Sequence, residues 1–192
     1  MIKNKLLYKL NLRKEISPIR DEVILDASKT KHLANSAAYN FLVHSEHNDY
    51  ICNTLLSECR NLLNFSLAAE NYDLWCMWND NSFLEGSNKW HNHIKSSTIN
   101  CVLYLKTVKG CGIKFCENLE IDQKDTHLWK QYESGKDIQY IEPKDFDVYI
   151  FPDFMMHAPY YPKDVLGDET RISLNYEIKC FEESTDIFNK KV

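Results

Sequence analysis

Several features that would assign a protein to a class are absent from this 192-residue sequence. No apolar run approaches the roughly 20 residues of a transmembrane helix, and Lys and Asn interrupt the first residues too often for a signal-peptide core. There is no internal repeat and no low-complexity tract. The net charge is −5 and no basic stripe is present, which argues against a nucleic-acid-coating protein. We therefore expect a cytoplasmic globular protein with neither a membrane nor a nucleic acid as its partner.

Paired cysteine motifs are also missing. The seven cysteines form an odd set without a CxxC pair, and several lie inside apolar runs such as residues 100–104. Disulfides are rare in the cytosol, and free cysteine is among the most buried residue types. The cysteines are therefore expected to be reduced, buried thiols.

The composition that remains is ordinary for a globular protein, with 44% hydrophobic and 27% charged residues. A chain of 192 residues predicts one domain with a substantial core. Within it we distinguish an N-terminal part at residues 1–71, a core at 72–180 and a polar tail at 181–192.

The N-terminal part mixes one strand with two helices. Residues 2–12 alternate apolar and polar side chains as a half-buried strand does, and Pro18 ends that pattern. A helix beginning at Asp26 or Ser28 would carry apolar residues at helical spacing as far as Leu42. A second helix over residues 51–67 places its leucines on one face.

From Tyr72 onward, short strands replace the helices. The expected strands are residues 74–79, 97–106, 112–116, 138–141, 147–152 and 171–180. Residues 119–136 are polar, and we expect a loop or short helix there over the mouth of a site. Helices followed by strands predict an α+β domain whose core is a β-sandwich or barrel, with the helices packed against a sheet.

Three histidines could form a metal site. His91 and His93 are separated by one residue, so on a strand both imidazoles would point to the same side. His157 is expected to end an apolar strand, so it need not lie on the surface, and it is the candidate third ligand. The alternative is that His91 and His93 are two solvated histidines on a surface hairpin.

An arginine opens the last expected strand. Alternation places Arg171, Ser173 and Asn175 on one face and Ile172 and Leu174 on the other. Inside a sandwich, a guanidinium without a partner would cost several kcal/mol, and a carboxylate ligand would supply that partner. The alternative is an edge strand whose polar face is exposed to solvent.

Together these motifs resemble a known family. The segments concerned are His91-x-His93, the strand ending at Tyr104, the run from Ile150 to His157 and the Arg171-Ile-Ser173 strand. They resemble the iron(II)- and 2-oxoglutarate-dependent oxygenases. The similarity is to their small bacterial and phage branch, which is related to prolyl hydroxylases. It covers roughly residues 72–180 and implies a double-stranded β-helix, a jelly-roll core similar to that of cupins.

The resemblance also implies roles for individual residues. His91 and His157 would be iron ligands, and Arg171 would bind the far carboxylate of 2-oxoglutarate with help from Ser173 and Tyr104. The implied reaction is oxidative decarboxylation of 2-oxoglutarate by O2, coupled to hydroxylation of a substrate. Aromatic residues expected at the substrate entrance are Trp129, Tyr160 and Tyr161.

The sequence departs from the family at His93, where the family usually has Asp or Glu. His93 could be the third ligand of a three-histidine site, which is the interpretation we favour. It could instead be a bystander whose place is taken by water or halide. A third possibility is that a carboxylate such as Glu117 or Asp153 provides the ligand from another strand.

Two other functions remain compatible with these residues. Three histidines around one open position also suit a cupin-like zinc or manganese enzyme, and a non-enzymatic β-sandwich binding module would need none of them. For an oxygenase, the substrate could be peptidyl proline, another protein side chain or a small molecule. The sequence leaves the oligomeric state open.

Overall fold

The computed structural model describes residues 6–30, 38–39, 45–63, 69–80, 90–94, 96–116, 138–181 and 184–189. Its strands are β1 (Tyr8–Asn11), β2 (Ala38–Tyr39), β3 (Ala69–Asn79), β4 (Ile99–Lys106), β5 (Gly112–Cys116), β6 (Ile138–Ile141), β7 (Asp147–Pro152), β8 (His157–Tyr160) and β9 (Arg171–Cys180). Its helices are α1 (Arg13–Ile16), α2 (Arg20–Thr30), α3 (Asn48–Leu63), α5 (Lys163–Leu166) and α6 (Ser184–Asn189).

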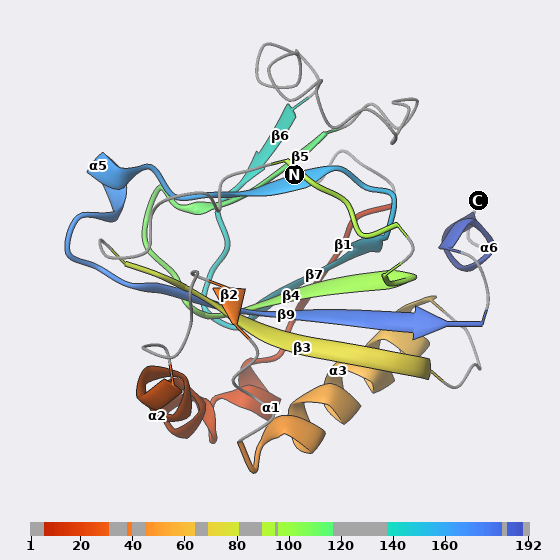
Figure 1. Ribbon diagram of the computed structural model, residues 1–192, viewed down its shortest axis with the longest axis horizontal. Coiled ribbons are helices and arrows are strands. Elements are labelled where there is room, and N and C mark those ends of the chain that lie inside the picture. Colours follow the sequence, from red (N-terminus) through yellow and green to blue (C-terminus); the bar gives the residue numbers. More distant parts are fainter. Residues whose placement is uncertain are drawn as a thin grey trace.

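The strands form two antiparallel sheets that face each other. The larger sheet has the order β1-β7-β4-β9-β3-β2, and the smaller has the order β6-β5-β8. Helices α1, α2 and α3 lie on the outer side of the larger sheet, whereas β5 and β6 lie on its other side (Figure 1). The larger sheet is therefore a middle layer that is buried on both faces.

The helical face of this sheet carries the larger hydrophobic core. On β9, side chains such as Leu174 and Ile178 belong to the same cluster as Ile51 and Leu55 of α3. Each of these aliphatic side chains contributes roughly 1.5–3 kcal/mol when it is fully buried. The expected packing of N-terminal helices on the major sheet is confirmed.

A second core fills the space between the two sheets. It joins Val102, Tyr149 and Phe151 of the larger sheet to Ile113 and Phe115 of the smaller one. Two facing antiparallel sheets with such a core form the double-stranded β-helix, and the expected α+β fold class is confirmed.

Most strand boundaries agree with those expected from alternation. The strands at 112–116, 138–141, 147–152 and 171–180 coincide with β5, β6, β7 and β9. Of the strand expected over residues 2–12, the structure describes β1 from Tyr8 to Asn11. The loop expected at 119–136 and Trp129 lie outside the described residues.

The first expected helix is placed differently. Helix α2 begins at Arg20 and ends at Thr30, so neither Asp26 nor Ser28 is its cap. Ala38 and Tyr39, which were expected to be helical, form β2 and pair with β3. Hydrogen bonding to the open edge of β3 therefore outweighs the helical spacing in this segment. The second helix is α3, which begins at Asn48 and ends at Leu63.

All seven cysteines are buried and none forms a disulfide, which confirms the thiol expectation. Among the helices that the structure describes, none has the length and apolar character needed to cross a membrane.

Candidate functional site

Backbone pairing brings the three histidines together. The amide of His91 donates to the carbonyl of His157 at 2.9 Å, and the amide of His157 donates back at 3.0 Å. The amide of His93 donates to the carbonyl of Asp153 at 2.8 Å. The segment that carries His91 and His93 is thus held along the turn that precedes β8.

Two local expectations differ from the structure. His91 forms an isolated β-bridge with His157, so the histidine pair does not lie on a regular strand. His157 does not end the apolar strand, because β7 stops at Pro152 and a turn carries the chain to β8 of the smaller sheet. Proline lacks the amide proton needed to extend the ladder. The sequence pattern missed this crossing between the sheets.

The imidazoles are close enough to share one ion. The candidate ligand atoms of His91, His93 and His157 all lie within 4.8 Å of one another. The two Nε2 atoms of His93 and His157 are 3.3 Å apart. Because a metal–imidazole bond is about 2.0–2.1 Å, two ligands of one ion can be separated by up to about 4.2 Å. The separation of His93 and His157 fits a shared ion.

Hydrogen bonds orient two of these rings. Nδ1 of His157 lies 2.9 Å from the carbonyl oxygen of Met155, which can only accept, so Nδ1 carries the proton. Nδ1 of His93 contacts the carboxylate of Glu177. In both rings Nε2 is thereby left as the nitrogen that can bind a metal.

The protonation state of His157 also suits a ligand. Burial lowers the pKa of His157 well below its ordinary value of 6.5, and the adjacent His91 and His93 lower it further. The ring is therefore neutral at neutral pH, which is the form that coordinates metal ions.

The second polar feature of the site, after the three histidines, is Arg171. Its guanidinium is buried, with 2% of the residue exposed. It donates to Oδ1 of Asn79 at 2.5 Å, to the hydroxyl of Tyr104 at 3.2 Å and to the carbonyl of Gly112 at 3.3 Å. Within the described residues no carboxylate lies at ion-pair distance from Arg171, and neither its Nε nor the Ser173 hydroxyl has a hydrogen-bond partner. A cation and a free hydroxyl are thus available to an acidic ligand.

Tyr104 keeps its proton in this setting. Burial raises its pKa above the ordinary 10.0, although the Arg171 guanidinium opposes that rise. The hydroxyl accepts from Arg171, so its own proton can be donated to a ligand carboxylate.

The histidines and Arg171 line one pocket between the sheets, which is partly open to solvent. Other residues that line it include Trp75, Met77, Val102, Phe151, Ser173 and Asn175. A small molecule with a metal-binding end and an acidic end could occupy this space.

The two tyrosines expected at the entrance have different surroundings. Tyr161 is buried, and its ring centroid lies 5.9 Å from the Arg171 guanidinium carbon. It packs with Val108, Cys111 and Leu166, and its role at the substrate entrance stays a prediction. Burial raises its pKa to about 12. Tyr160 is exposed and packs edge-on against Tyr140 at 5.4 Å.

Two polar residues of the site were missed. Asn79 holds Arg171, and Glu177 contacts His93. The alternation of Arg171, Ser173 and Asn175 along β9, extended by one more step, reaches Glu177. The strand pattern could therefore have found Glu177, whereas Asn79 depends on the pairing of β3 with β9.

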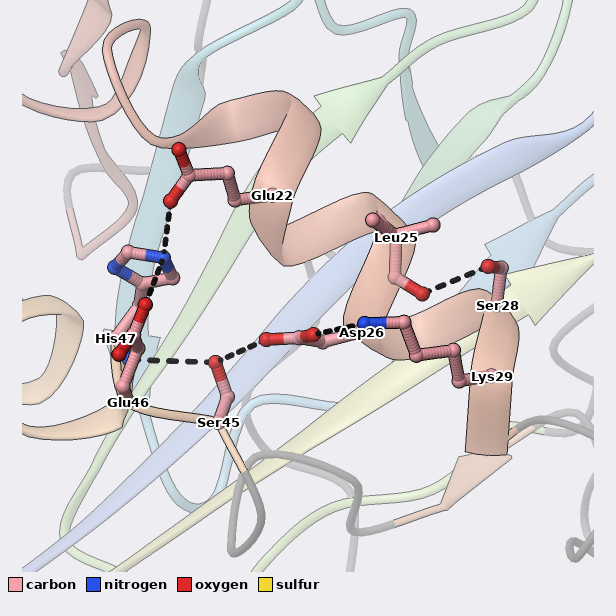
Figure 2. A network of polar contacts seen from close by, with 8 residues as sticks. All are labelled: Glu22, Leu25, Asp26, Ser28, Lys29, Ser45, Glu46 and His47. Atoms are coloured by element: carbon pink, nitrogen blue, oxygen red, sulfur yellow. Dashed lines mark hydrogen bonds and ion pairs between the residues drawn. The ribbon is translucent and has the colours of Figure 1, made fainter.

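A second group of possible ligands lies on the surface. His47 Nε2 is 2.8 Å from Glu22, and Glu46 is nearby (Figure 2). The side chains of Glu22 and Glu46 are 65% and 84% exposed, which favours solvated polar contacts over a metal site. Ser45, which donates to Asp26 at 3.0 Å, makes a further link between α2 and the segment before α3.

Comparisons by sequence give no match, either to a protein-family model or to a curated protein. Comparison with solved structures, in contrast, gives many matches. HygX from Streptomyces hygroscopicus, solved with nickel and 2-oxoglutarate bound, is similar with a TM-score of 0.63 at 10% identity over 93% of this chain and 85% of HygX. The carbocyclase SnoK from nogalamycin biosynthesis is described as non-heme and alpha ketoglutarate dependent. It is similar with a TM-score of 0.59 at 9% identity, over 93% of this chain and 82% of SnoK.

A prolyl 4-hydroxylase from Phytophthora capsici gives a TM-score of 0.62 at 13% identity over 94% of this chain, which spans 61% of that protein. These similarities show that the chain has the fold of the 2-oxoglutarate-dependent oxygenases, prolyl hydroxylases among them.

Proposed function

We propose that this protein is an iron(II)- and 2-oxoglutarate-dependent oxygenase that hydroxylates its substrate. The observation that carries the proposal is Arg171, a buried cation without a carboxylate partner in the described chain, in the same cavity as three convergent histidines. Desolvating an unpaired charge is costly, so an acidic ligand is the natural partner.

His91, His93 and His157 would hold the metal ion. Imidazole nitrogen suits Fe(II) among other transition metals, and three protein ligands leave positions open for a chelating cosubstrate and O2. When bound, Fe(II) and 2-oxoglutarate supply the oxidising power for hydroxylation and yield succinate and carbon dioxide.

The chain's own groups would bind and orient the cosubstrate. Arg171 offers its unpartnered Nε to the carboxylate remote from the metal, while Asn79 and Gly112 hold the guanidinium in place. The hydroxyls of Tyr104 and Ser173 complete the set of donors. Because Arg171, Tyr104 and Ser173 are themselves buried, each of these interactions is stronger than in water.

We extend the proposal to the substrate, which would be peptidyl proline or another protein side chain. The similarity in fold to prolyl 4-hydroxylases from Phytophthora capsici and Pseudomonas putida supports this extension. It is tested by succinate release that depends on added proline-containing peptides, compared with matched peptides in which alanine replaces proline.

A second candidate is a zinc or manganese enzyme with a cupin-like three-histidine site. It is favoured by the donor set itself, since catalytic zinc is bound by three histidines in some enzymes. In that case Arg171 would bind an acidic substrate and 2-oxoglutarate would not be consumed.

The deciding experiment is anaerobic thermal unfolding with Fe(II) and 2-oxoglutarate, on wild type and on Arg171→Met. At ten times its Kd, 2-oxoglutarate should add about 1.4 kcal/mol of stability, or roughly 3–6 °C for a chain of this size. The variant should lose that shift. Without ligand it should unfold near the wild-type temperature, because losing the cost of burying a cation offsets the lost hydrogen bonds.

The outcomes separate the candidates. A 2-oxoglutarate shift that requires metal and disappears in Arg171→Met supports the oxygenase. A metal shift with no 2-oxoglutarate shift favours the zinc or manganese enzyme. The absence of any shift with every divalent metal tested would contradict both.

A further inference from the structure

Glu177 is a buried acid that the proposed reaction has not yet used. It lies on β9, opposite Asn100 of β4, and 8% of the residue is exposed. Its carboxylate contacts Nδ1 of His93. It lines the same cavity as the three histidines and Arg171.

The surroundings of Glu177 require a strong donor at that contact. Within the described chain, His93 is the only basic side chain within ion-pair distance of Glu177, and no Lys or Arg lies that close. A buried carboxylate loses its hydration and is stable only where a good hydrogen bond or opposite charge replaces it. A neutral imidazole N–H supplies this weakly. The same N–H becomes a much stronger donor when a metal ion binds the other ring nitrogen.

The two ring nitrogens of His93 face different partners. Nδ1 faces Glu177, while Nε2 lies 3.3 Å from Nε2 of His157. A carboxylate can only accept, so the contact places the proton on Nδ1 and leaves the Nε2 lone pair toward the cluster. Outer carboxylates that fix a ligating histidine in this way raise its basicity as a ligand.

Glu177 also addresses the departure at His93. With histidine in place of a carboxylate, the three ligands are neutral and the loaded centre is one unit more positive than one with two histidines and an acid. The charge of Glu177, placed behind the His93 ring, removes that excess without occupying a coordination position. The centre then has the charge of the carboxylate type and the ligand atoms of the three-histidine type.

We propose that Glu177 is a positioning residue of the metal centre, which orients His93 through Nδ1 and supplies the negative charge that the three histidines lack. The proposal rests on the proposed function only in requiring a divalent metal at the histidines. It does not depend on 2-oxoglutarate.

The test is a double-mutant cycle read by Co(II) affinity, measured by competition with a chromophoric chelator on the full chain. Glu177→Ala should weaken Co(II) binding by about 10–100-fold, the usual effect of removing an outer-shell partner. Glu177→Gln, which keeps an acceptor oxygen without the charge, should bind Co(II) with an affinity between those of wild type and Glu177→Ala. In the His93→Ala background, adding Glu177→Ala should change the affinity less than it does in wild type, since the orienting contribution is gone and only the charge remains.

The matched control is Glu169→Gln, which removes one negative charge from an exposed position and should leave Co(II) affinity unchanged. In metal-free protein, long-range proton–nitrogen NMR should show His93 with its proton on Nδ1, and this preference should weaken in Glu177→Ala. A loss of fold alone would not move the tautomer selectively.

Three results would overturn the inference. One is that Glu177→Ala binds Co(II) with the same affinity as wild type. Another is His93→Ala binding Co(II) as wild type does, which would show that His93 is not a ligand through which Glu177 could act. The third is no Co(II) binding by wild type, which would remove the metal centre altogether. If the double-mutant cycle in Co(II) affinity gives the expected result but 2-oxoglutarate causes no thermal shift, the role of Glu177 would be supported and the oxygenase function contradicted.

Discussion

Nε2 of His93 lies 3.3 Å from Nε2 of His157, although the two residues are 64 positions apart in the chain. His93 follows the segment that bridges to β8, and His157 opens β8 itself. An ion bound between them would therefore join two segments whose contact depends on the complete fold. Metal binding should be coupled to the stability of the whole sandwich.

The first prediction concerns this coupling. Replacing His157 by Ala should lower the affinity for Co(II) or Fe(II) by more than the roughly 10–100-fold loss caused by removing an outer-shell partner, because a direct ligand is lost. Metal-induced stabilisation in thermal unfolding should disappear with it. The control is His47→Ala, which removes a histidine from the surface group beside Glu22. If His47→Ala abolished metal binding while His157→Ala retained it, the histidine cluster would not be the metal centre.

How much of this could be predicted from the sequence depends on the range of the interaction. Strand β9 was predictable with its boundaries, because the alternation of Arg171, Ser173 and Asn175 with apolar residues is a local pattern. Motif spacing and family resemblance predicted the three histidines and Arg171 as site residues, and their roles stay a prediction. The structure brings them to one cavity.

What failed was decided by contacts between distant segments. Ala38 and Tyr39 sit in a helix-like pattern, yet their pairing with Met77 and Cys76 makes them a strand. Tyr161 was expected at the substrate entrance and not in a core, but it is buried and packs with Val108 and Leu166. No local pattern reports either partner, so neither outcome follows from the sequence alone.

The second prediction concerns Asp147, which links β1 to β7. Burial would raise its pKa, but hydrogen bonds from Lys9, Asn11 and the Lys144 amide outweigh burial and lower it below 3.8. Below pH 3.8 the unfolded chain takes up a proton that the folded chain still resists, so stability falls with falling pH in that range. Asp147→Asn should cost about 1–3 kcal/mol at neutral pH.

Denaturant unfolding from pH 6 to pH 2 tests this prediction. The difference between wild type and Asp147→Asn should shrink as pH falls below 3.8. Asp164→Asn, at an exposed position, is the matched control and should follow wild type throughout. A constant difference across the whole range would show that the charge of Asp147 is not what stabilises the β1–β7 contact.

The third prediction concerns His157 in the metal-free protein. Its folded pKa lies well below 6.5 because of burial and the neighbouring histidines. Between these two values the unfolded chain binds a proton that the folded chain does not, so stability should decrease as pH falls from 6.5. Unfolding midpoints between pH 8 and pH 5 should therefore slope more steeply in wild type than in His157→Gln. Equal slopes would contradict the stated protonation of His157.

The fourth prediction concerns Tyr104, whose hydroxyl accepts from Arg171 at 3.2 Å. Tyr104→Phe removes a donor that would reach the ligand carboxylate. Hydrogen bonds to charged groups are worth about 1.5–3 kcal/mol, so calorimetry should show a roughly ten- to hundred-fold higher Kd for 2-oxoglutarate. Tyr149→Phe is the matched control, because Tyr149 packs against Tyr104 edge-on at 6.1 Å. If both variants weakened binding equally, the effect would come from packing and not from the Tyr104 hydroxyl.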